Sequence, residues 1–536
     1  MRNRCLSKFS YLLFLRFSLF LPFLLSLFML SLMTACSDTE PYTGALPYIF
    51  IPPIEFVNPP TELQQEVGNG EHDVPPPEIP QFNEYLFDLD FEPETRMFSG
   101  MGSVRYTNRT GITLNEVVFR LYLNENSDNN HVRRPQTQGL NGFRPETNPG
   151  FMNILHVSQD NVEISFAVTD SVMTVYLPRP LEPDETISIR LQFEAYVPIS
   201  ALHTGANTKA VWGGMFLPTV AVFGDNGWHK ESLHPIGNPF IMEVANYVVS
   251  ITTPIGYIVA GTGVKTESYS EYEKTTTFVA HVTRDFAFAI SPVFRQAMQT
   301  TPRGAEVHLY HYTENLPVDY ILDIVVEAMA YFEENIGSYS YGQLRVVETN
   351  MFVNSINFSQ VIFVDSFHLR HIGELDNLRQ EVARQWFTGV VGHNPVTEAW
   401  LHEGLSLLLA EMSRSTNLRP LITESHRTLQ MHHEAIPENV RRISTNINKY
   451  DNLADYRLIQ QQKARLMFYV LLVEMGDENF MNLLREYYNQ FPFKIATSQD
   501  FIQIAEEIQG ESLSHFFDYW LNTTELPELP ERRSGR

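Results

Sequence analysis

The spacing of apolar residues changes once along the chain, near Pro302, and this change limits the fold more than any other feature. Before it, apolar and polar residues alternate, as over residues 187–193, which is the pattern of half-buried strands. Similar runs occur at 117–123, 247–253 and 275–283, separated by Gly, Pro, Asn and Asp. Residues 84–302 are therefore predicted to form an antiparallel β-domain of sandwich or saddle type.

After Pro302 the apolar residues follow the spacing of helices. A helix is expected to begin at Asp319 and to be stopped by Gly337, because the apolar residues between them share one face. A β-rich stretch is expected at 344–364, and further helices at 374–387, 398–412, 458–475, 480–488 and 500–508. These elements predict an α+β, mainly helical part, which we divide into residues 303–430 and 431–536.

The N-terminal residues combine four basic side chains with an apolar run over 17–34 that leads to Ala35-Cys36. This arrangement resembles a bacterial lipoprotein signal, in which a small residue precedes a cysteine that is lipidated and becomes the mature N-terminus. Residues 1–35 are therefore expected to be a signal peptide, and Cys36 to carry the lipid. An uncleaved transmembrane anchor is the alternative, since the run is just long enough to span a bilayer. Both interpretations place the remaining chain at the cell membrane, on its extracytoplasmic face.

The next segment, residues 36–83, contains ten of the 32 prolines, including Pro75-Pro76-Pro77. Proline-rich segments are extended and form neither helices nor central strands, so this segment is predicted to tether the folded part to the membrane. An N-terminal arm that packs on the β-domain through apolar residues 48–51 is the alternative.

Charge and cysteine content exclude two classes of protein. Asp and Glu outnumber Lys and Arg by 63 to 38, which gives a formal charge of −25. A nucleic-acid partner is not expected, because a phosphate backbone requires clustered Lys and Arg. A disulfide framework is excluded as well, since the chain has two cysteines.

Two stretches of the helical part carry the chemical information. Residues 379–387 read Arg-Gln-Glu-Val-Ala-Arg-Gln-Trp-Phe, residues 400–404 read Trp-Leu-His-Glu-Gly, and eighteen residues (385–402) separate Arg384 from Glu403. They resemble the membrane alanyl aminopeptidase (aminopeptidase N) family of zinc metallopeptidases, which are gluzincins. That family reads H-E-x-x-H-x-W-F and, at the same distance, W-L-x-E-G. The resemblance implies a β-domain followed by a thermolysin-like peptidase domain, with aminopeptidase activity that depends on zinc.

The positions that would bind zinc depart from this family pattern. Two His at i and i+4 share a helix face, and with a Glu from the next helix they form a three-ligand site. This chain has Gln380 and Arg384 in place of the two His and retains Glu403. Gln is a poor zinc ligand, and Arg cannot be one because it stays protonated. Glu381 stands where the family has its general base, but without a metal-bound water it has nothing to activate.

Two further positions depart from the family in the same way. The family's G-x-M-E-N segment aligns with residues 354–359, which puts Asn357 where a Glu would hold the substrate α-ammonium group. The Y-x-K-G pattern aligns with residues 461–464, which puts Gln461 where a Tyr would stabilise the transition state. An oxyanion donor then survives only as an amide.

These departures favour a degenerate peptidase, a pseudoenzyme without zinc. In this hypothesis Arg384 replaces the metal cation and pairs with Glu403 and Glu381, so that no carboxylate is buried without a partner. The alternative for Arg384 is that it points to solvent. The alternative for the protein is an active metallo-aminopeptidase with a rewired zinc site. Nearby candidates for replacement ligands are His368, His371, His393 and His402.

The predicted function is peptide or protein binding, or scaffolding, at the cell surface. The expected cleft lies between the β-domain and the helical domain, with Phe352, Phe358, Trp386 and Tyr456 lining or underlying it. The expected partners are the membrane, through the lipid anchor, and a peptide or protein ligand. No cofactor is expected, except zinc under the alternative interpretation. A structural module of a membrane or cell-wall complex is a third class.

Overall fold

The computed structural model describes residues 82–126, 150–200, 202–231, 233–234, 236–351, 353–415 and 417–529. They belong to one compact unit, Ile79–Arg536. The predicted signal peptide, the predicted tether and the predicted lipidation site at Cys36 lie outside the described residues. Within the described ranges, no helix has both the length and the apolar character needed to cross a membrane.

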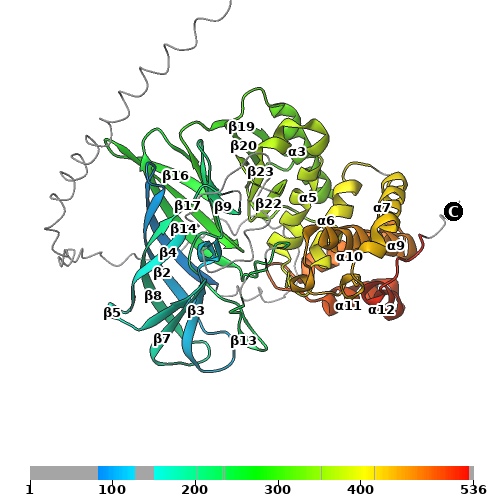
Figure 1. Ribbon diagram of the computed structural model, residues 1–536, viewed down its shortest axis with the longest axis horizontal. Helices are drawn as coiled ribbons and strands as arrows, with labels where there is room; N and C mark the ends of the chain where they lie inside the picture. Colours follow the sequence, from blue (N-terminus) through cyan, green and yellow to red (C-terminus); the bar gives the residue numbers. More distant parts are fainter. Residues whose placement is uncertain are drawn as a thin grey trace, which may run out of the picture. The chain divides into compact units, whose positions relative to one another are not determined.

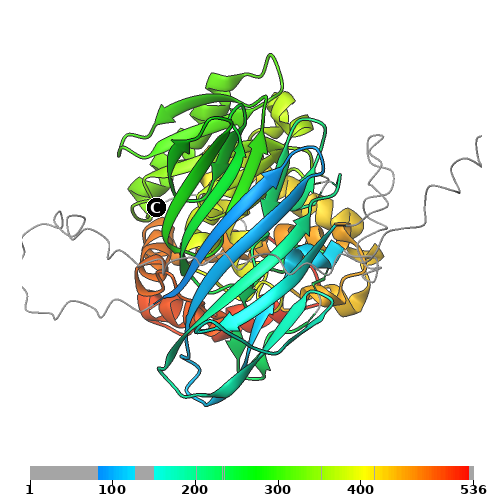
Figure 2. The same ribbon diagram turned by 90° about the vertical axis from the view of Figure 1, so that its left-hand side faces the viewer.

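The first half of this unit is rich in strands. They are β1 (Asn83–Glu92), β2 (Met97–Thr107), β3 (Leu114–Arg120), β4 (Phe151–Gln159), β5 (Val162–Glu163), β6 (Phe166–Thr169), β7 (Val172–Leu181), β8 (Thr186–Tyr196), β9 (Thr204–Ala206), β10 (Val211–Gly214), β11 (Thr219–Val220), β12 (Phe223–Gly224), β13 (Gly227–Trp228), β14 (Ala245–Pro254), β15 (Ile258–Gly261), β16 (Val264–Tyr269), β17 (Glu273–Thr283) and β18 (Ala287–Ser291). An eight-stranded sheet dominates, in the order β16-β17-β14-β1-β2-β8-β4-β5 (Figure 2). Its neighbours are antiparallel, except β1 and β14, which are parallel. Two four-stranded sheets, β15-β18-β10-β9 and β11-β3-β7-β6, and the β12-β13 pair accompany it.

The alternating pattern of the sequence accounts for these strands. In β8 the residues Ile187, Ile189, Leu191 and Phe193 are all buried, and they contribute to one core with the inward side of β1, β2 and β14. Successive side chains of a strand point to opposite faces, so alternation produces one buried and one outward face. The predicted antiparallel β-domain is confirmed. The run at 117–123 is shorter as a strand than predicted, because β3 ends at Arg120 and a 3-10 helix, η2 (Tyr122–Asn126), follows.

The second half combines a five-stranded sheet with helices, as predicted (Figure 1). The sheet has the order β19-β20-β21-β23-β22, and its three central strands are parallel. Its strands are β19 (Arg295–Thr300), β20 (Glu306–His311), β21 (Gln343–Thr349), β22 (Ser355–Phe358) and β23 (Val361–Asp365). Strand β19 precedes the predicted limit at residue 302 but pairs with β20, so this sheet begins earlier in the chain than the predicted second part.

The helical elements follow the apolar spacing where that spacing is clear. They are α3 (Val318–Asn335), α4 (Ser366–Arg370), η3 (Ile372–Glu374), α5 (Asn377–Arg384), η4 (Gln385–Val390), α6 (Trp400–Met412), α7 (Arg419–His432), η5 (His433–Ala435), η6 (Glu438–Val440), η7 (Ile447–Lys449), α8 (Leu453–Tyr456), η8 (Arg457–Lys463), α9 (Ala464–Met475), α10 (Asp477–Gln490), α11 (Ser498–Gln509) and α12 (Ser514–Asn522). The sequence did not predict α7, whose buried stripe is narrow and consists of Ile422, Ser425 and Leu429. It also did not predict α12 and did not anticipate the π-helical turns η4 and η8.

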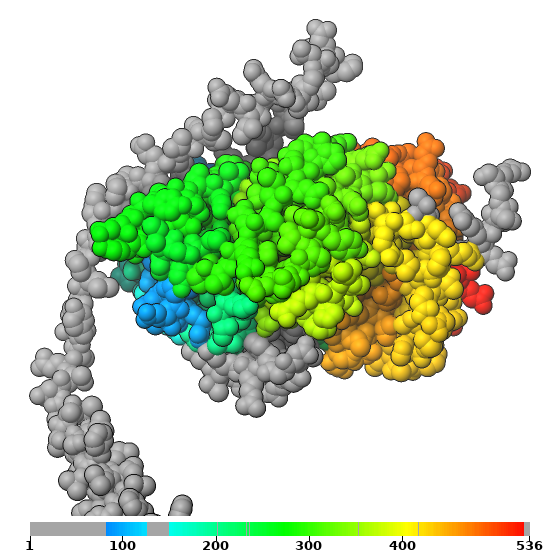
Figure 3. Space-filling model, turned by 90° about the horizontal axis from the view of Figure 1, so that it is seen from above, coloured from blue at the N-terminus to red at the C-terminus, as the bar shows by residue number. Residues whose placement is uncertain are grey.

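Arg284, between β17 and β18, joins the β-rich part to the helical part. Its buried guanidinium group donates hydrogen bonds to the carbonyl oxygens of Met242 and Thr388, at 2.9 Å each, and to those of Val390 and Lys494, at 3.2 Å each. The carbonyls at the end of a helix have no partner within it, and a cation there is favourable. Arg284 therefore caps the end of η4 from the β-rich side. In the space-filling view, residues of the two parts adjoin directly (Figure 3).

We predict that the substitution Arg284→Leu lowers the free energy of unfolding by about 3 kcal/mol or more, because it orphans several buried carbonyl groups. Urea unfolding followed by circular dichroism measures the effect. The matched control is Arg295→Leu, which removes an exposed arginine paired with Glu314 and is expected to cost less than about 1 kcal/mol. Equal effects of the two substitutions would contradict the role of Arg284 as the junction.

Candidate functional site

A cavity of about 290 Å³ lies between the β-rich part and the helices. Its β-side wall consists of loop residues 202–203 and 237–240, and its other walls consist of residues 353–357, the α5 face, α6 and residues 453–462. This is where the sequence predicted a cleft. The cavity receives side chains from segments that are far apart in the chain, so its composition follows from the tertiary structure.

Helix α5 directs Gln380 and Arg384 into this cavity. Both residues line it, whereas Leu378 and Val382 of the same helix are buried in the core with Trp386, which follows in η4. Residues four apart lie on one helix face, so the apolar contacts of one side fix the direction of the other. The predicted orientation of Gln380 and Arg384 toward the cleft is thus observed.

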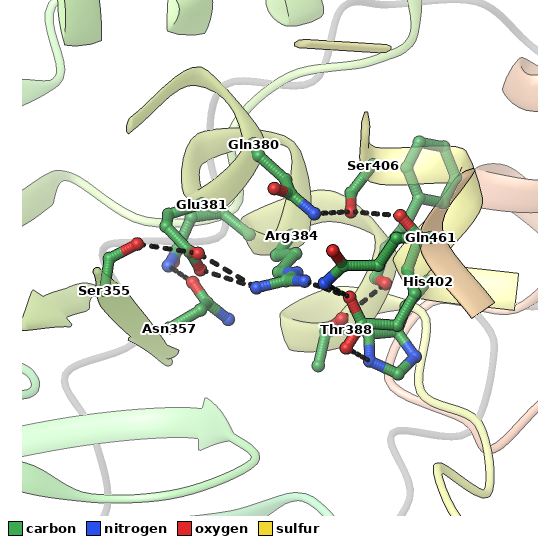
Figure 4. Close-up of polar contacts among 12 residues, drawn as sticks. Ser355, Asn357, Gln380, Glu381, Arg384, Thr388, His402, Ser406 and Gln461 are labelled. Carbon is green, nitrogen blue, oxygen red and sulfur yellow. Dashed lines mark hydrogen bonds and ion pairs between the residues drawn. The ribbon is translucent and has the colours of Figure 1, made fainter. Parts of the chain in front are cut away.

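Arg384 connects the two carboxylates of the site. Its Nη1 donates to both oxygens of Glu381, at 2.9 and 3.1 Å, and its Nη2 donates to Oε2 of Glu403 at 2.5 Å (Figure 4). The alternative expectation, that Arg384 points to solvent, is wrong, since 13% of its side chain is exposed. The ion pair expected from the sequence is present on both sides.

The opposite charges of Arg384 and Glu403 stabilise each other's ionised forms. Burial alone would lower the pKa of Arg384, but the nearby carboxylates of Glu381 and Glu403 raise it above its ordinary value. Burial alone would raise the pKa of Glu403, but the Arg384 guanidinium, aided by His402 and Gln461, holds it well below its ordinary value. At neutral pH the site therefore contains one guanidinium cation and an ionised Glu403.

The two carboxylates also accept hydrogen bonds from other side chains. Ser355 Oγ donates to Glu381 Oε1 at 2.9 Å. Tyr456 Oη donates to Glu403 Oε1 at 2.8 Å, and Gln461 Nε2 donates to Glu403 Oε2 at 2.9 Å. Ser355, the first residue of β22, lies within the aligned segment 354–359, but the sequence did not single it out as a partner of Glu381.

Gln461 reaches Glu403 because two helical segments approach closely. A Cβ atom on Gly404 would lie 2.5 Å from Cβ of Ala464, so a larger residue at this place in α6 would push away the start of α9. Gly404 is the glycine of the Trp-Leu-His-Glu-Gly stretch. Its role is close packing, which holds Gln461 over the carboxylate.

Asn357 and Gln380 complete the polar lining. Asn357 Oδ1 accepts a hydrogen bond from Nε2 of Gln385, the first residue of η4. Gln380 Nε2 donates to Ser406 Oγ at 3.3 Å. The sequence predicted the places of Asn357, Gln380 and Gln461 at the cleft, but it did not reveal Gln385 or Ser406, which fix how these amides point.

The histidines near the motif do not gather into one group. His393 and His402 stack with ring centroids 4.3 Å apart, and His402 Nε2 lies 3.4 Å from Glu403 Oε1. Burial, followed by the charge of His402, lowers the pKa of His393 well below its ordinary value. His368 contacts Asp365 instead. In the part of the chain that the structure describes, no cluster of three or more His, Cys, Asp or Glu residues could hold a metal ion.

The aromatic residues predicted at the cleft divide into two groups. Tyr456 lines the cavity and contacts Glu403, as described above. Phe358 and Trp386 are instead fully buried in apolar cores, so they underlie the site. Phe352 lies outside the described residues.

The groups at the expected metal position do not fit a zinc ion. Zinc binds thiolate, imidazole and carboxylate groups, and the helix face here offers the Gln380 amide and the Arg384 guanidinium. The oxygens of Glu403 already accept bonds from Arg384, Gln461 and Tyr456. A dication in this place would also repel the Arg384 cation.

Comparison with known proteins matches the helical part of the chain to one family of peptidases. Residues 320–520 match the peptidase family M1 domain. This part of the chain is thus similar to the domain of M1 peptidases. The resemblance to aminopeptidase N-like gluzincins is thereby confirmed.

Among curated relatives, human aminopeptidase O is 25% identical over 192 residues, which are 30% of this chain and 23% of that protein. Human aminopeptidase Q is 22% identical over 494 residues, which are 83% of this chain and 48% of that protein. This chain thus matches at most about half the length of these relatives.

Solved M1 structures share the fold. The M1 zinc metallopeptidase of Deinococcus radiodurans superposes with a TM-score of 0.63 and 16% identity, over 84% of this chain and 96% of that one. A mutant of that protein has also been solved with a Tyr-Ser-Ala substrate bound, with a TM-score of 0.62 and 15% identity over the same shares of the two chains. The predicted fold class, a β-domain followed by a thermolysin-like peptidase domain, is confirmed.

We predict that Arg384→Leu destabilises the protein by about 3 kcal/mol or more at neutral pH, because it leaves two buried carboxylates unpaired. The loss should shrink as the pH falls. In the native protein the pKa of Glu403 is lowered, so its stabilising effect is present above its unfolded pKa and is lost as the pH falls. In the Arg384→Leu variant the pKa of the buried Glu403 carboxyl in the folded state is expected to lie above its value in the unfolded state. Protonation of this carboxyl below about pH 5 therefore removes the cost of burying its charge.

Urea unfolding of both proteins across this pH range measures the difference. The control adds Glu381→Gln and Glu403→Gln to Arg384→Leu, which removes the unpaired charges and should recover most of the lost stability. A deficit that is the same at every pH would show that packing, rather than charge, explains the effect of Arg384→Leu.

Proposed function

We propose that this M1 family member is a zinc-less pseudopeptidase, tethered to the membrane on its extracytoplasmic side, that binds a peptide or protein ligand. One observation supports this most strongly. The guanidinium group of Arg384 lies between Glu381 and Glu403, where the family pattern calls for a zinc-bound water and its neighbours.

The chemistry of this cation differs from that of zinc. A guanidinium group neutralises nearby carboxylates and donates hydrogen bonds, but it cannot bind water as a metal does or lower its pKa to near 7. Glu381, at the general-base position, is engaged by Arg384 and Ser355. In this proposal the protein keeps the peptidase scaffold but lacks the metal-bound water that would attack a peptide bond.

Binding is proposed because the cavity is still present. It is lined by polar side chains from both parts of the unit, together with Phe240, Leu407 and Tyr456. A concave site with a few oriented polar groups is typical of ligand binding. The substrate complex of the similar Deinococcus radiodurans metallopeptidase makes a peptide the first ligand class to test.

An active metallo-aminopeptidase with a rewired zinc site is the second candidate. The observation that favours it is that His402 lies 3.4 Å from Glu403, so an imidazole and a carboxylate adjoin in the site. Under this alternative Arg384 would have to swing away before a metal could bind, and zinc would be the cofactor.

We predict that the purified chain contains no zinc by elemental analysis, and that the double variant Gln380→His, Arg384→His gains about one zinc per chain, since it restores the two-His helix face. Hydrolysis of amino-acyl reporter substrates is expected to be absent from the native chain. The matched control is Gln380→Ala, Arg384→Ala, which removes the guanidinium group without adding ligands and should gain no metal.

One zinc per native chain together with hydrolysis of the reporters would establish the active alternative and overturn the proposal. Zinc uptake by the Ala variant would show that residues other than the introduced His bind the metal.

The proposed membrane tether has a separate test. We predict that Cys36→Ser prevents lipidation and leaves a larger, unprocessed chain, whereas Cys5→Ser, the control within the same segment, is processed normally. Labelling cells with a radioactive or clickable fatty acid, followed by gel electrophoresis, detects the lipid. Equal labelling of the Cys36→Ser variant and the native protein would contradict the assignment of Cys36.

A further inference from the structure

We infer that the cleft selects peptide segments without a free N-terminus, that is, chain interiors or blocked ends, over peptides with an α-ammonium group. This inference rests on the proposed peptide-binding function and names its ligand class. It follows from which atoms of the cavity lining donate and which accept hydrogen bonds. The contacts of Gln385 determine this at Asn357.

The first fixed group is the side chain of Gln385. The backbone N–H of Gln360 donates to Gln385 Oε1 at 3.0 Å, and a backbone N–H can only donate. The Gln385 oxygen is therefore identified without ambiguity, and its Nε2 must be the atom that donates to the Phe358 carbonyl at 2.9 Å and to Asn357 Oδ1. The usual uncertainty between the two ends of an amide is removed at this residue.

The orientation of Asn357 follows from that of Gln385. Because its oxygen accepts from Gln385 Nε2, its Nδ2 amide group is left to face the cavity that Asn357 lines (Figure 4). Asn357 is 6% exposed, so it is held among buried neighbours. The cleft thus presents a hydrogen-bond donor at this position, and a donor pairs with a carbonyl oxygen but not with an ammonium group.

The acidic residues that line the cavity offer an ammonium group no carboxylate that is free of a counter-ion. Among the described lining residues they are Glu381 and Glu403. Both are ion-paired with Arg384, and their oxygens also accept from Ser355, Tyr456 and Gln461. An α-ammonium group that entered here would lose its hydration beside a guanidinium cation, which is unfavourable.

Neutral peptide groups find both kinds of partner in the same cleft. Gln461 donates its Nε2 to Glu403, and Gln380 donates its Nε2 to Ser406, so each has its Oε1 left as an acceptor. A peptide bond offers one carbonyl acceptor and one N–H donor. Donors at Asn357 and acceptors at Gln380 and Gln461 therefore match an uncharged backbone segment.

The test compares two pools of random-sequence nonapeptides, one N-acetylated and one with a free amine, both amidated and labelled with fluorescein at the C-terminus. Fluorescence anisotropy with the full chain in detergent gives the affinities, at about pH 6.5, where the α-amine is protonated. We expect the acetylated pool to bind about tenfold more tightly, since burying a charge without a counter-ion is costly.

The decisive variant is Asn357→Asp, which changes one NH₂ group to an oxygen, keeps the acceptor for Gln385 and should reverse the preference. Asn357→Ala, which removes the donor without adding charge, should reduce binding of the acetylated pool toward that of the free pool. Asn489→Asp, which adds the same charge on an exposed face of α10, is the control and should keep the native preference. Thermal unfolding verifies that each variant is folded.

The outcomes separate this inference from the function on which it rests. Equal binding of the two pools, tighter binding of the free pool, or the same response of Asn357→Asp and Asn489→Asp would overturn the inference while leaving peptide binding in place. If the native chain binds neither pool, both the inference and the proposed peptide-binding function fail.

Discussion

The contact of Arg384 with Glu381 and Glu403 is the interaction on which the rest of the site depends. Two buried carboxylates so close together require a cation, because without one their desolvation is not compensated. In a metallopeptidase the cation is a metal ion, and in this chain it is a guanidinium group provided by the helix itself. The scaffold can therefore fold with its acidic residues in place, and each carboxylate faces a cation without a ligand from solution.

Hydrogen bonds at the two ends of η4, the segment that follows Arg384, support this contact. Arg284 caps the carbonyl groups at the end of η4 from the β-rich side, and Gln385 at the start of η4 fixes Asn357 in β22. The π-helical turn between them contains Phe387 with φ −109° and ψ 44°, which breaks the helical geometry. The site thus rests on a short irregular segment that is held at both ends by buried hydrogen bonds, and small changes there are expected to reach the cleft.

Much of the fold could be predicted, because its elements carry strong periodic signals. The alternation in β8 and the apolar face of α3 each specify one buried side, and the structure follows both. Helix α7 was missed because its buried stripe is narrow. The π-helical turns were missed because an inserted residue leaves the composition of a helix unchanged. In the site, the motif spacing located Gln380, Arg384 and Glu403, but no local pattern identified Ser355, Gln385 or Ser406, which contact them from other elements.

The sequence by itself determined the order of the two parts and the resemblance to the M1 peptidase pattern, with Gln380 and Arg384 where that pattern has His, since these depend on residue type and spacing along the chain. The tertiary structure decided how the remaining groups pair. Hydrogen-bond direction at Asn357 depends on Gln385, which lies 28 positions along the chain, and the partners of Arg384 include Glu403, 19 positions away. Such pairings arise only when packing brings distant segments together, and they determine whether the cleft presents a donor, an acceptor or a charge.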